Sequence, residues 1–175
     1  MTVDSVDRLL ILDLGSGTNP NLMDGMDIIH LDMAEGPHVE IVANLNNGIP
    51  VPSNIFDRVL AVDVLEHVNN VIFVMDEIHR VLKPDGVVFV RGPVFGSPNH
   101  VTDPTHQRGF TIQSFDFFDD TTELGGGHGK MYTKRRWNID KSEYTSGGQD
   151  VAFIMTALKP NEEPSKWGLN SNPTK

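Results

Sequence analysis

The feature that most constrains the fold is a short apolar run that stops at a glycine turn. Residues 9–14 read LLILDL, and Gly15, Ser16 and Gly17 follow directly. A continuous run of this length is typical of a strand buried on both faces of a parallel sheet. Glycine lets the backbone turn sharply and lets a ligand approach the main chain closely. The segment therefore predicts the first strand of an α/β sheet, with a ligand-binding turn at its carboxyl end.

The remaining apolar segments predict more strands and two helices. Strands are expected over 28–31, 39–42, 58–62, 87–90 and 151–158, and the segment around 132–144 can pair with the last of them. Apolar residues recur at helical spacing from Val71 to Leu82, after the capping residues Asn69 or Asn70. A second helix is expected over 111–118, capped by Thr111.

Strand, glycine turn, strand, helix, strand is the order of a Rossmann-like, doubly wound α/β sheet. The sheet should be mostly parallel, with a late antiparallel strand. A parallel crossover usually takes about a dozen residues or more, and the links after residues 19 and 33 are shorter. We therefore expect shortened early crossovers, within one domain over 1–160. A flexible tail should follow over 161–175, where the 175-residue chain is polar and rich in proline.

Composition excludes several chemistries. The chain has 14 Lys+Arg and 24 Asp+Glu, a formal net charge of −10, which disfavours a nucleic-acid partner. It has no cysteine, so disulfides, thiolate metal sites and cysteine nucleophiles are excluded. Neither a signal peptide nor a membrane span is expected, which makes a cytoplasmic location the default.

Acidic groups follow two of the predicted strands. Asp32 ends the second strand, where a carboxylate can accept hydrogen bonds from two ribose hydroxyls; a solvated loop aspartate is the alternative. Asp63, Glu66 and His67 follow the fourth strand, at the same edge as the glycine turn. Pro20 stands where a dinucleotide-binding turn would continue towards its third glycine, which favours a ligand without a pyrophosphate.

Taken together, these segments resemble the class I S-adenosylmethionine-dependent methyltransferases. The similar segments are DLGSGTN (13–19), Asp32, Asn44-Leu45, IFDR (55–58), VLEHV (64–68) and EIHRVLKPDG (77–86), and with the adjoining strands the resemblance covers 9–90. The resemblance implies S-adenosylmethionine as the cofactor. It carries the cofactor-binding role to Asp13, Gly15, Ser16, Gly17, Asn19, Asp32, Met33, Asn44, Leu45, Asp63, Val64 and His67. Two positions depart from the family pattern: Asn44 replaces an aspartate and Asp85 a glycine.

A later stretch, SPNHVTDPTHQRGFT over 97–111, is similar to small bacterial and phage-borne methyltransferase-domain proteins. It offers His106, His100 and Asp103 as catalytic candidates, because an imidazole or carboxylate can take the proton of a methyl acceptor. Hydrogen bonding within the loop is the alternative role. Two imidazoles and a carboxylate can also hold a metal, but we expect none.

The resemblance implies methyl transfer, and our leading hypothesis for the acceptor is an oxygen or nitrogen of a small molecule or saccharide-type compound, such as a glycoconjugate precursor. The alternative is a non-catalytic or regulatory protein that binds the same cofactor. A nucleic-acid methyltransferase that uses the basic stretch 130–137 is a weaker option, since that stretch reads as a solvated strand edge. The shortened crossovers leave sheet surface that a second copy could cover in a homodimer.

Overall fold

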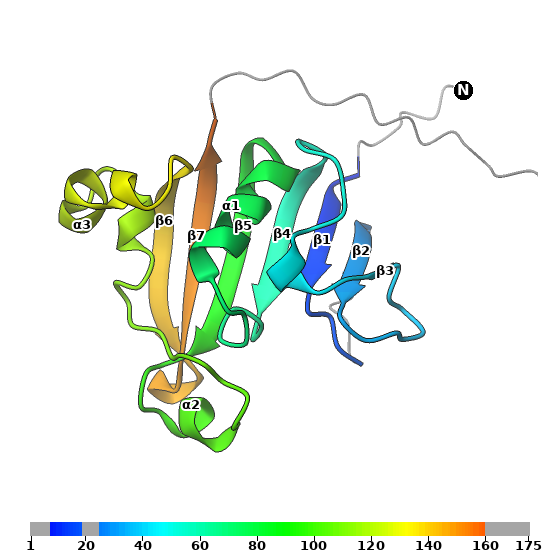
Figure 1. The fold of residues 1–175 in the computed structure, drawn as a ribbon, viewed down its shortest axis with the longest axis horizontal. Coiled ribbons are helices and arrows are strands. Elements are labelled where there is room, and N and C mark those ends of the chain that lie inside the picture. Colours follow the sequence, from blue (N-terminus) through cyan, green and yellow to red (C-terminus); the bar gives the residue numbers. More distant parts are fainter. Residues whose placement is uncertain (1–7, 19–24, 160–175) are drawn as a thin grey trace, which may run out of the picture.

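The computed structural model describes residues 8–18 and 25–159. Within these residues, the strands form one sheet of seven in the order β3-β2-β1-β4-β5-β7-β6 (Figure 1). The strands are β1 (Leu10–Leu14), β2 (Asp27–Asp32), β3 (Ile41–Val42), β4 (Phe56–Val62), β5 (Leu82–Pro93), β6 (Arg136–Thr145) and β7 (Asp150–Leu158).

The sheet is parallel in its first part and antiparallel at its end. Strand β1 pairs in parallel with β2 and β4, β2 with β3, and β4 with β5. Strand β7 runs antiparallel between β5 and β6. These pairings confirm the predicted mostly parallel sheet with late antiparallel strands. Chain order reverses between β1 and β4, and such switch points are where open α/β sheets bind ligands.

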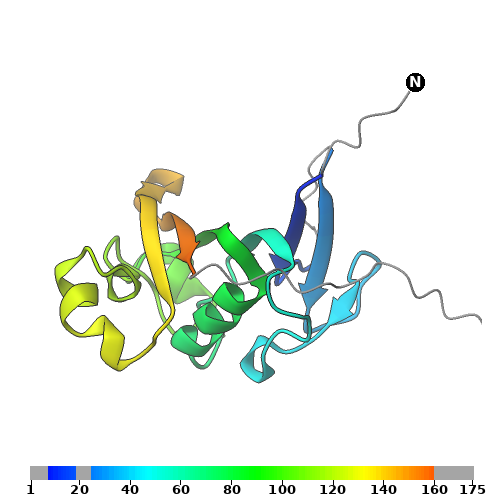
Figure 2. The same ribbon diagram turned by 90° about the horizontal axis from the view of Figure 1, so that it is seen from above.

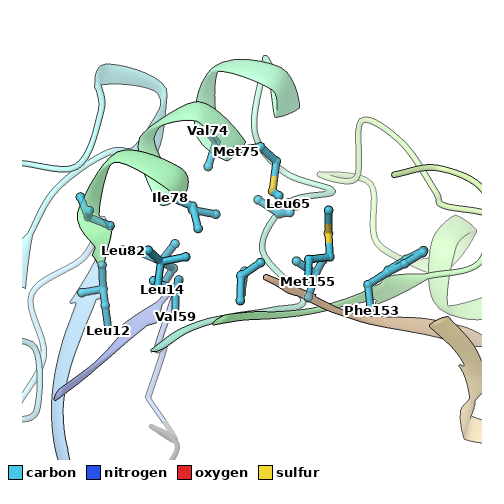
Figure 3. Close-up of a cluster of buried hydrophobic side chains, with 14 of the residues drawn as sticks. Leu12, Leu14, Val59, Leu65, Val74, Met75, Ile78, Leu82, Phe153 and Met155 are labelled. Carbon is cyan, nitrogen blue, oxygen red and sulfur yellow. The ribbon is translucent and has the colours of Figure 1, made fainter. Parts of the chain in front are cut away.

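Helix α1 (Val71–Val81) covers one face of the sheet, as Figure 2 shows. Its cap is Asn70, whose side-chain oxygen accepts a hydrogen bond from the Phe73 N–H at 3.1 Å. The helix and the sheet bury their apolar faces against each other (Figure 3). The helix contributes Val74, Met75 and Ile78, and the strands contribute Leu12, Leu14, Val59, Phe153 and Met155. Each such side chain contributes roughly 1.5–3 kcal/mol on burial.

The early links of the sheet are short, as expected. Between β3 and β4 the chain forms only the 3₁₀-helix η1 (Leu45–Asn47), and between β2 and β3 it forms no helix. In the described part of the link between β1 and β2 there is likewise no helix. The predicted tail, 161–175, lies outside the described residues.

The predicted helix over 111–118 is wrong. That segment forms turns and the 3₁₀-helix η2 (Asp116–Phe118). Phe115 and Phe118 of this segment pack inward and stack with Phe110: the Phe115 ring lies 5.7 Å from Phe110 and 6.0 Å from Phe118. Asp119 then ends the turn by accepting the Thr121 N–H at 2.8 Å. Burying this stack against the core outweighs the helical propensity of the segment.

Helix α1, which was expected to reach Leu82, ends one residue earlier at Val81. The remaining helices of the described residues are short. They are α2 (Pro98–Thr102), α3 (Glu123–Gly127), η3 (Gly129–Met131) and η4 (Ser146–Gly148). Leu82 begins β5 instead of ending α1, and Asp85 within β5 has a left-handed backbone with φ of 59°. In the described part of the chain, no helix has the length and apolar character needed to span a membrane.

Candidate active site

A cavity of about 550 Å³ lies at the carboxyl ends of β1, β2 and β4. This volume falls within the range of roughly 300–1,000 Å³ that small-molecule sites occupy. Its predicted lining residues are Gly15, Asp32, Met33, Asn44, Leu45, Asp63, Val64 and His67. The structure thus brings most of the predicted cofactor-binding residues together in one cavity, which we call the cofactor pocket.

The turn after β1 forms one side of this pocket. Gly15 adopts a left-handed backbone with φ of 64°, and its N–H donates to the Leu31 carbonyl at 2.8 Å. A Cβ atom at Gly15 would lie 2.6 Å from the Val64 side chain, closer than real contacts allow. Position 15 therefore needs glycine both for its conformation and for the close approach of β1 to the loop after β4.

Asp32 anchors the other side of the turn. Its Oδ2 accepts a hydrogen bond from the Gly17 N–H at 2.8 Å, and its Oδ1 accepts one from the Ala34 N–H at 2.9 Å. Each carboxylate oxygen has a second lone pair, so both can still accept from the two adjacent hydroxyls of a ribose. The site fits the ribose of S-adenosylmethionine by its donor and acceptor chemistry.

Asn44 and Leu45 form the wall opposite the glycine turn. The Asn44 Oδ1 caps η1 by accepting from the Asn46 N–H at 2.9 Å, which fixes the side chain at the pocket. One lone pair of this oxygen and its amide N–H groups remain for a heterocycle edge. Leu45 is buried and offers the adjacent apolar surface.

Three of the predicted cofactor residues do not line the pocket in the described structure. Asp13 is buried beneath it, with Oδ2 3.1 Å from the His30 Nδ1. Ser16 is buried as well and holds the turn through its N–H. Gly17 contributes its N–H to Asp32, and Asn19 lies outside the described residues.

Sequence reasoning missed several lining residues of the cofactor pocket. These are Leu31, Ala43, Asn46, Val68, Asn69, Thr105 and Gln107. Thr105 and Gln107 belong to the recognisable stretch over 97–111, so a signal existed for the segment. The sequence placed this stretch near the acceptor but did not show which of its side chains reach the cofactor pocket.

A second cavity of about 620 Å³ shares Asp63 with the cofactor pocket. We call it the acidic pocket, because carboxylates dominate its lining. Its lining residues are Asp63, Glu66, Pro93, Asn99, Thr102, Asp103, Pro104, His106 and Asp150. Asp63 has a left-handed backbone with φ of 52° and forms an ion pair with Arg91. The Asn99 amide donates to Asp150 at 2.8 Å, which ties α2 to the start of β7.

The three catalytic candidates have different surroundings. His106 lines the acidic pocket, with its Nε2 3.9 Å from Glu66 and 3.8 Å from Asp103. His100 is not among the lining residues, and its Nδ1 accepts the Gly96 N–H at 3.0 Å. Asp103 accepts two hydrogen bonds from Thr105, and these lower the pKa of its carboxyl group. His106 is thus the candidate whose free nitrogen reaches the pocket.

Glu66 is the buried carboxyl group of this region and was not among the predicted catalytic residues. Its side chain is 1% exposed, and burial raises its pKa from 4.5 to about 7. A carboxyl group with a pKa near neutrality can both accept and release a proton under ordinary conditions. The structure therefore adds Glu66 to the groups at the boundary of the two pockets.

The loop after β5 is tied to the loop after β4 by two side chains. The Arg108 guanidinium donates to the carbonyl oxygens of Leu65, Val68 and Asn69. The Gln107 main-chain N–H donates to the Glu66 carbonyl at 2.9 Å, and its side-chain amide donates to the His67 carbonyl at 2.8 Å. The two loops that form the pocket boundary are therefore one connected unit.

Comparisons with known proteins agree with this geometry. Residues 12–90 match the family model described as a methyltransferase domain. That span includes the glycine turn, Asp32, Asn44 and the β4 loop with Glu66. No curated protein matches the chain in sequence.

Solved structures share the fold at low identity. A SAM-dependent methyltransferase from Archaeoglobus fulgidus is 14% identical with a TM-score of 0.58, over 86% of each chain. The carbon methyltransferase CurJ is 12% identical with a TM-score of 0.58, over 90% of this chain and 50% of that chain. The [4+2]-cyclase SpnF is 14% identical with a TM-score of 0.61, over 86% and 75%. At these identities the likeness shows the fold, which carries several reactions.

The sequence motifs, the arrangement of the cofactor pocket and the family match lead to one conclusion. Residues 12–90 match a methyltransferase domain and the chain has the fold of S-adenosylmethionine-dependent methyltransferases, which together imply S-adenosylmethionine as the cofactor.

Proposed function

We propose that the chain transfers the methyl group of S-adenosylmethionine to an oxygen or nitrogen of a polar small molecule. A saccharide or glycoconjugate precursor is the favoured acceptor. The observation that carries this proposal is that the cofactor pocket and the acidic pocket meet at Asp63. An acceptor in the second pocket would thus lie beside a cofactor in the first. Holding both reactants in line can contribute about 7–11 kcal/mol to lowering the barrier.

The lining of the acidic pocket supports this acceptor class. Four carboxyl groups line it, from Asp63, Glu66, Asp103 and Asp150, and none of the described lining residues is lysine or arginine. Carboxylates accept hydrogen bonds from hydroxyl and ammonium groups and repel phosphate and carboxylate groups. Hydroxyl-rich or amine-bearing acceptors therefore suit the pocket, and phosphorylated ones or nucleic acids do not.

When no metal ion is bound, His106 is the proposed general base, which takes the proton from the hydroxyl or amine of the methyl acceptor. Its Nδ1 lies 3.1 Å from the His100 carbonyl oxygen, which can only accept, so Nδ1 carries the proton and Nε2 keeps the lone pair. Glu66 beside it would stabilise the imidazolium that forms. A general base of this kind typically raises the rate by roughly 10²–10⁴-fold.

The test is formation of S-adenosylhomocysteine with a panel of acceptors. The panel contains neutral saccharides, amino sugars and their phosphorylated counterparts, together with an activated carbon acid. We expect turnover of neutral or amino acceptors and at least about tenfold lower kcat/KM for the phosphorylated partner of each pair. Preference for phosphorylated or carbon acceptors would contradict the proposal. Cofactor binding without turnover of any acceptor would support a non-catalytic, regulatory role instead.

A further inference from the structure

Glu66, His67 and His106 bring their donor atoms together at the boundary of the two pockets. One ligand atom from each side chain lies within 4.8 Å of the other two. The rings of His67 and His106 meet edge to face, with centroids 4.6 Å apart. His67 lines the cofactor pocket, while Glu66 and His106 line the acidic pocket. Two imidazole nitrogens and one carboxylate form a ligand set that divalent transition metals prefer.

Hydrogen bonds hold both imidazole rings in one tautomer. Thr105 Oγ1 donates its proton to Asp103 at 2.6 Å, so it can only accept from the His67 Nδ1–H at 2.9 Å. The His100 carbonyl likewise accepts from the His106 Nδ1–H at 3.1 Å. Both neutral rings therefore keep a lone pair on Nε2. Metal-binding histidines are held in this way, with the second ring nitrogen donating to a fixed oxygen.

Glu66 supplies a second, independent indication of a bound cation. Its side chain is 1% exposed, and its Oε2 has no hydrogen-bond partner among the described residues. Its Oε1 lies 3.9 Å from the His106 Nε2, too far for a hydrogen bond. A buried carboxylate oxygen without a partner is costly, and a cation beside it would remove that cost.

We propose that Glu66, His67 and His106 bind a divalent transition-metal ion, with Zn²⁺ as the ion to test first. Ligand bonds of about 2.1 Å in tetrahedral geometry place the ligand atoms about 3.4 Å apart, so the present separations, all within 4.8 Å, must close by at most about 1.4 Å. Three protein ligands leave one position of a tetrahedral ion for water or substrate. The proposed site revises the expectation, made from the sequence, that no metal is bound. Its ligands also differ from the set considered there, which was His100, Asp103 and His106.

Binding of the metal ion does not depend on the proposed function. The effect of the ion on catalysis, however, rests on the proposed function. A metal ion lowers the pKa of an oxygen bound to it, so an acceptor hydroxyl at the open position would lose its proton more readily. His106 is then a ligand, and the proton of the acceptor passes to solvent instead of to the imidazole. Metal-free and metal-loaded enzyme should therefore differ in the pH dependence of kcat.

The first test is calorimetric titration of the chelator-treated full chain with ZnCl₂. We expect one ion per chain. His67→Gln and His106→Gln should each weaken binding by about 100-fold or more, and Thr105→Val, which removes the hydroxyl that bonds His67 and Asp103 but no ligand atom, by about 10-fold. The matched controls are His38→Gln and His128→Gln, which replace exposed histidines elsewhere and should bind as the parent does. Equal affinity in all five variants would overturn the inference.

The second test uses the unmutated chain, so it does not depend on whether the variants fold. Co²⁺ in a four- or five-coordinate site with nitrogen ligands gives strong visible absorption, whereas hydrated Co²⁺ gives weak absorption. We expect strong bands that Zn²⁺ abolishes, and weak bands alone would overturn the inference. Methyl transfer without any metal binding would overturn only this inference. Metal binding without methyl transfer to any acceptor would overturn only the proposed function.

Discussion

The two pockets that meet at Asp63 are built in different ways. The cofactor pocket is made largely of backbone turns that follow strands β1 to β4, such as the Gly15 turn, the Asp32 anchor and the η1 cap at Asn44. The acidic pocket is made of side chains from segments far apart in sequence, including Glu66, His106 and Asp150. The first pocket depends on local geometry, and the second depends on how distant loops pack. A side-chain substitution in the acidic pocket that leaves the loop main chain in place should therefore change cofactor affinity little.

The largest effect should come from Gly15→Ala. A Cβ at 2.6 Å from Val64 and the left-handed backbone together cost roughly 4 kcal/mol in the present turn, so the turn should move in the variant, and restoring it on binding would weaken cofactor affinity by up to about 1,000-fold. The matched control is Gly17→Ala. Position 17 is also left-handed, with φ of 58°, but a Cβ there meets nothing within 4 Å. It should cost about 1 kcal/mol, or about fivefold. Calorimetric titration with S-adenosylmethionine measures both, and similar losses would refute the close-approach argument.

Asp32→Ala should have the next largest effect. It removes the acceptor of the Gly17 N–H and the proposed acceptor of the ribose hydroxyls, at about 3 kcal/mol, so cofactor affinity should fall about 150-fold. Asp27→Ala on the same strand removes a surface pair with Arg8 and should change affinity less than about threefold. Unchanged affinity in Asp32→Ala would remove the ribose assignment.

Glu66→Gln tests the separation of the two pockets directly. The substitution keeps the size of the side chain and removes its charge, so turnover should fall about 100-fold while the dissociation constant for S-adenosylmethionine changes less than about threefold. Steady-state kinetics and calorimetry on the same preparation provide the two readouts. A parallel loss of cofactor affinity would show that the pockets are not independent.

The smallest effect concerns the core at the end of the sheet away from both pockets, and it sets the pH range in which the pockets can be compared. Burial lowers the pKa of His79 from 6.5 to about 4, and the ring packs against Trp137 while its Nε2 lies 3.3 Å from the Leu158 carbonyl. In the unfolded chain His79 is protonated below about pH 6.5, whereas in the folded chain it is protonated only below about pH 4. Stability should fall with pH across this window, by roughly 2 kcal/mol between pH 8 and pH 5.

Urea unfolding of the parent and of His79→Gln at pH 8 and pH 5, both with chelator present, measures this contribution. The variant should lose less stability on acidification than the parent. His38→Gln, at an exposed position, should lose as much as the parent. An equal loss in His79→Gln would assign the acid sensitivity to other groups.

Most residues predicted for the cofactor side line one cavity, and the signals that pointed to them are local. A glycine turn after a buried strand, an acidic residue at the end of the next strand and the periodic face of α1 each depend on a few neighbouring residues. Chain-neighbour patterns could not show that Thr105 and His106 reach Glu66 and His67, some forty residues earlier, because loop packing decides it. The predicted helix over 111–118 failed for the same reason, since burial of Phe115 decided its conformation.

The joined loops at the pocket boundary have a thermodynamic consequence. Arg108 and Gln107 bind the loop after β5 to the carbonyl oxygens of the loop after β4, and both loops contribute to both pockets. An acceptor that displaces one loop therefore also moves residues that line the cofactor pocket. By linkage, the cofactor then alters acceptor affinity by the same factor as the acceptor alters cofactor affinity. Measured in either order of addition, the two binding steps should report one shared coupling free energy.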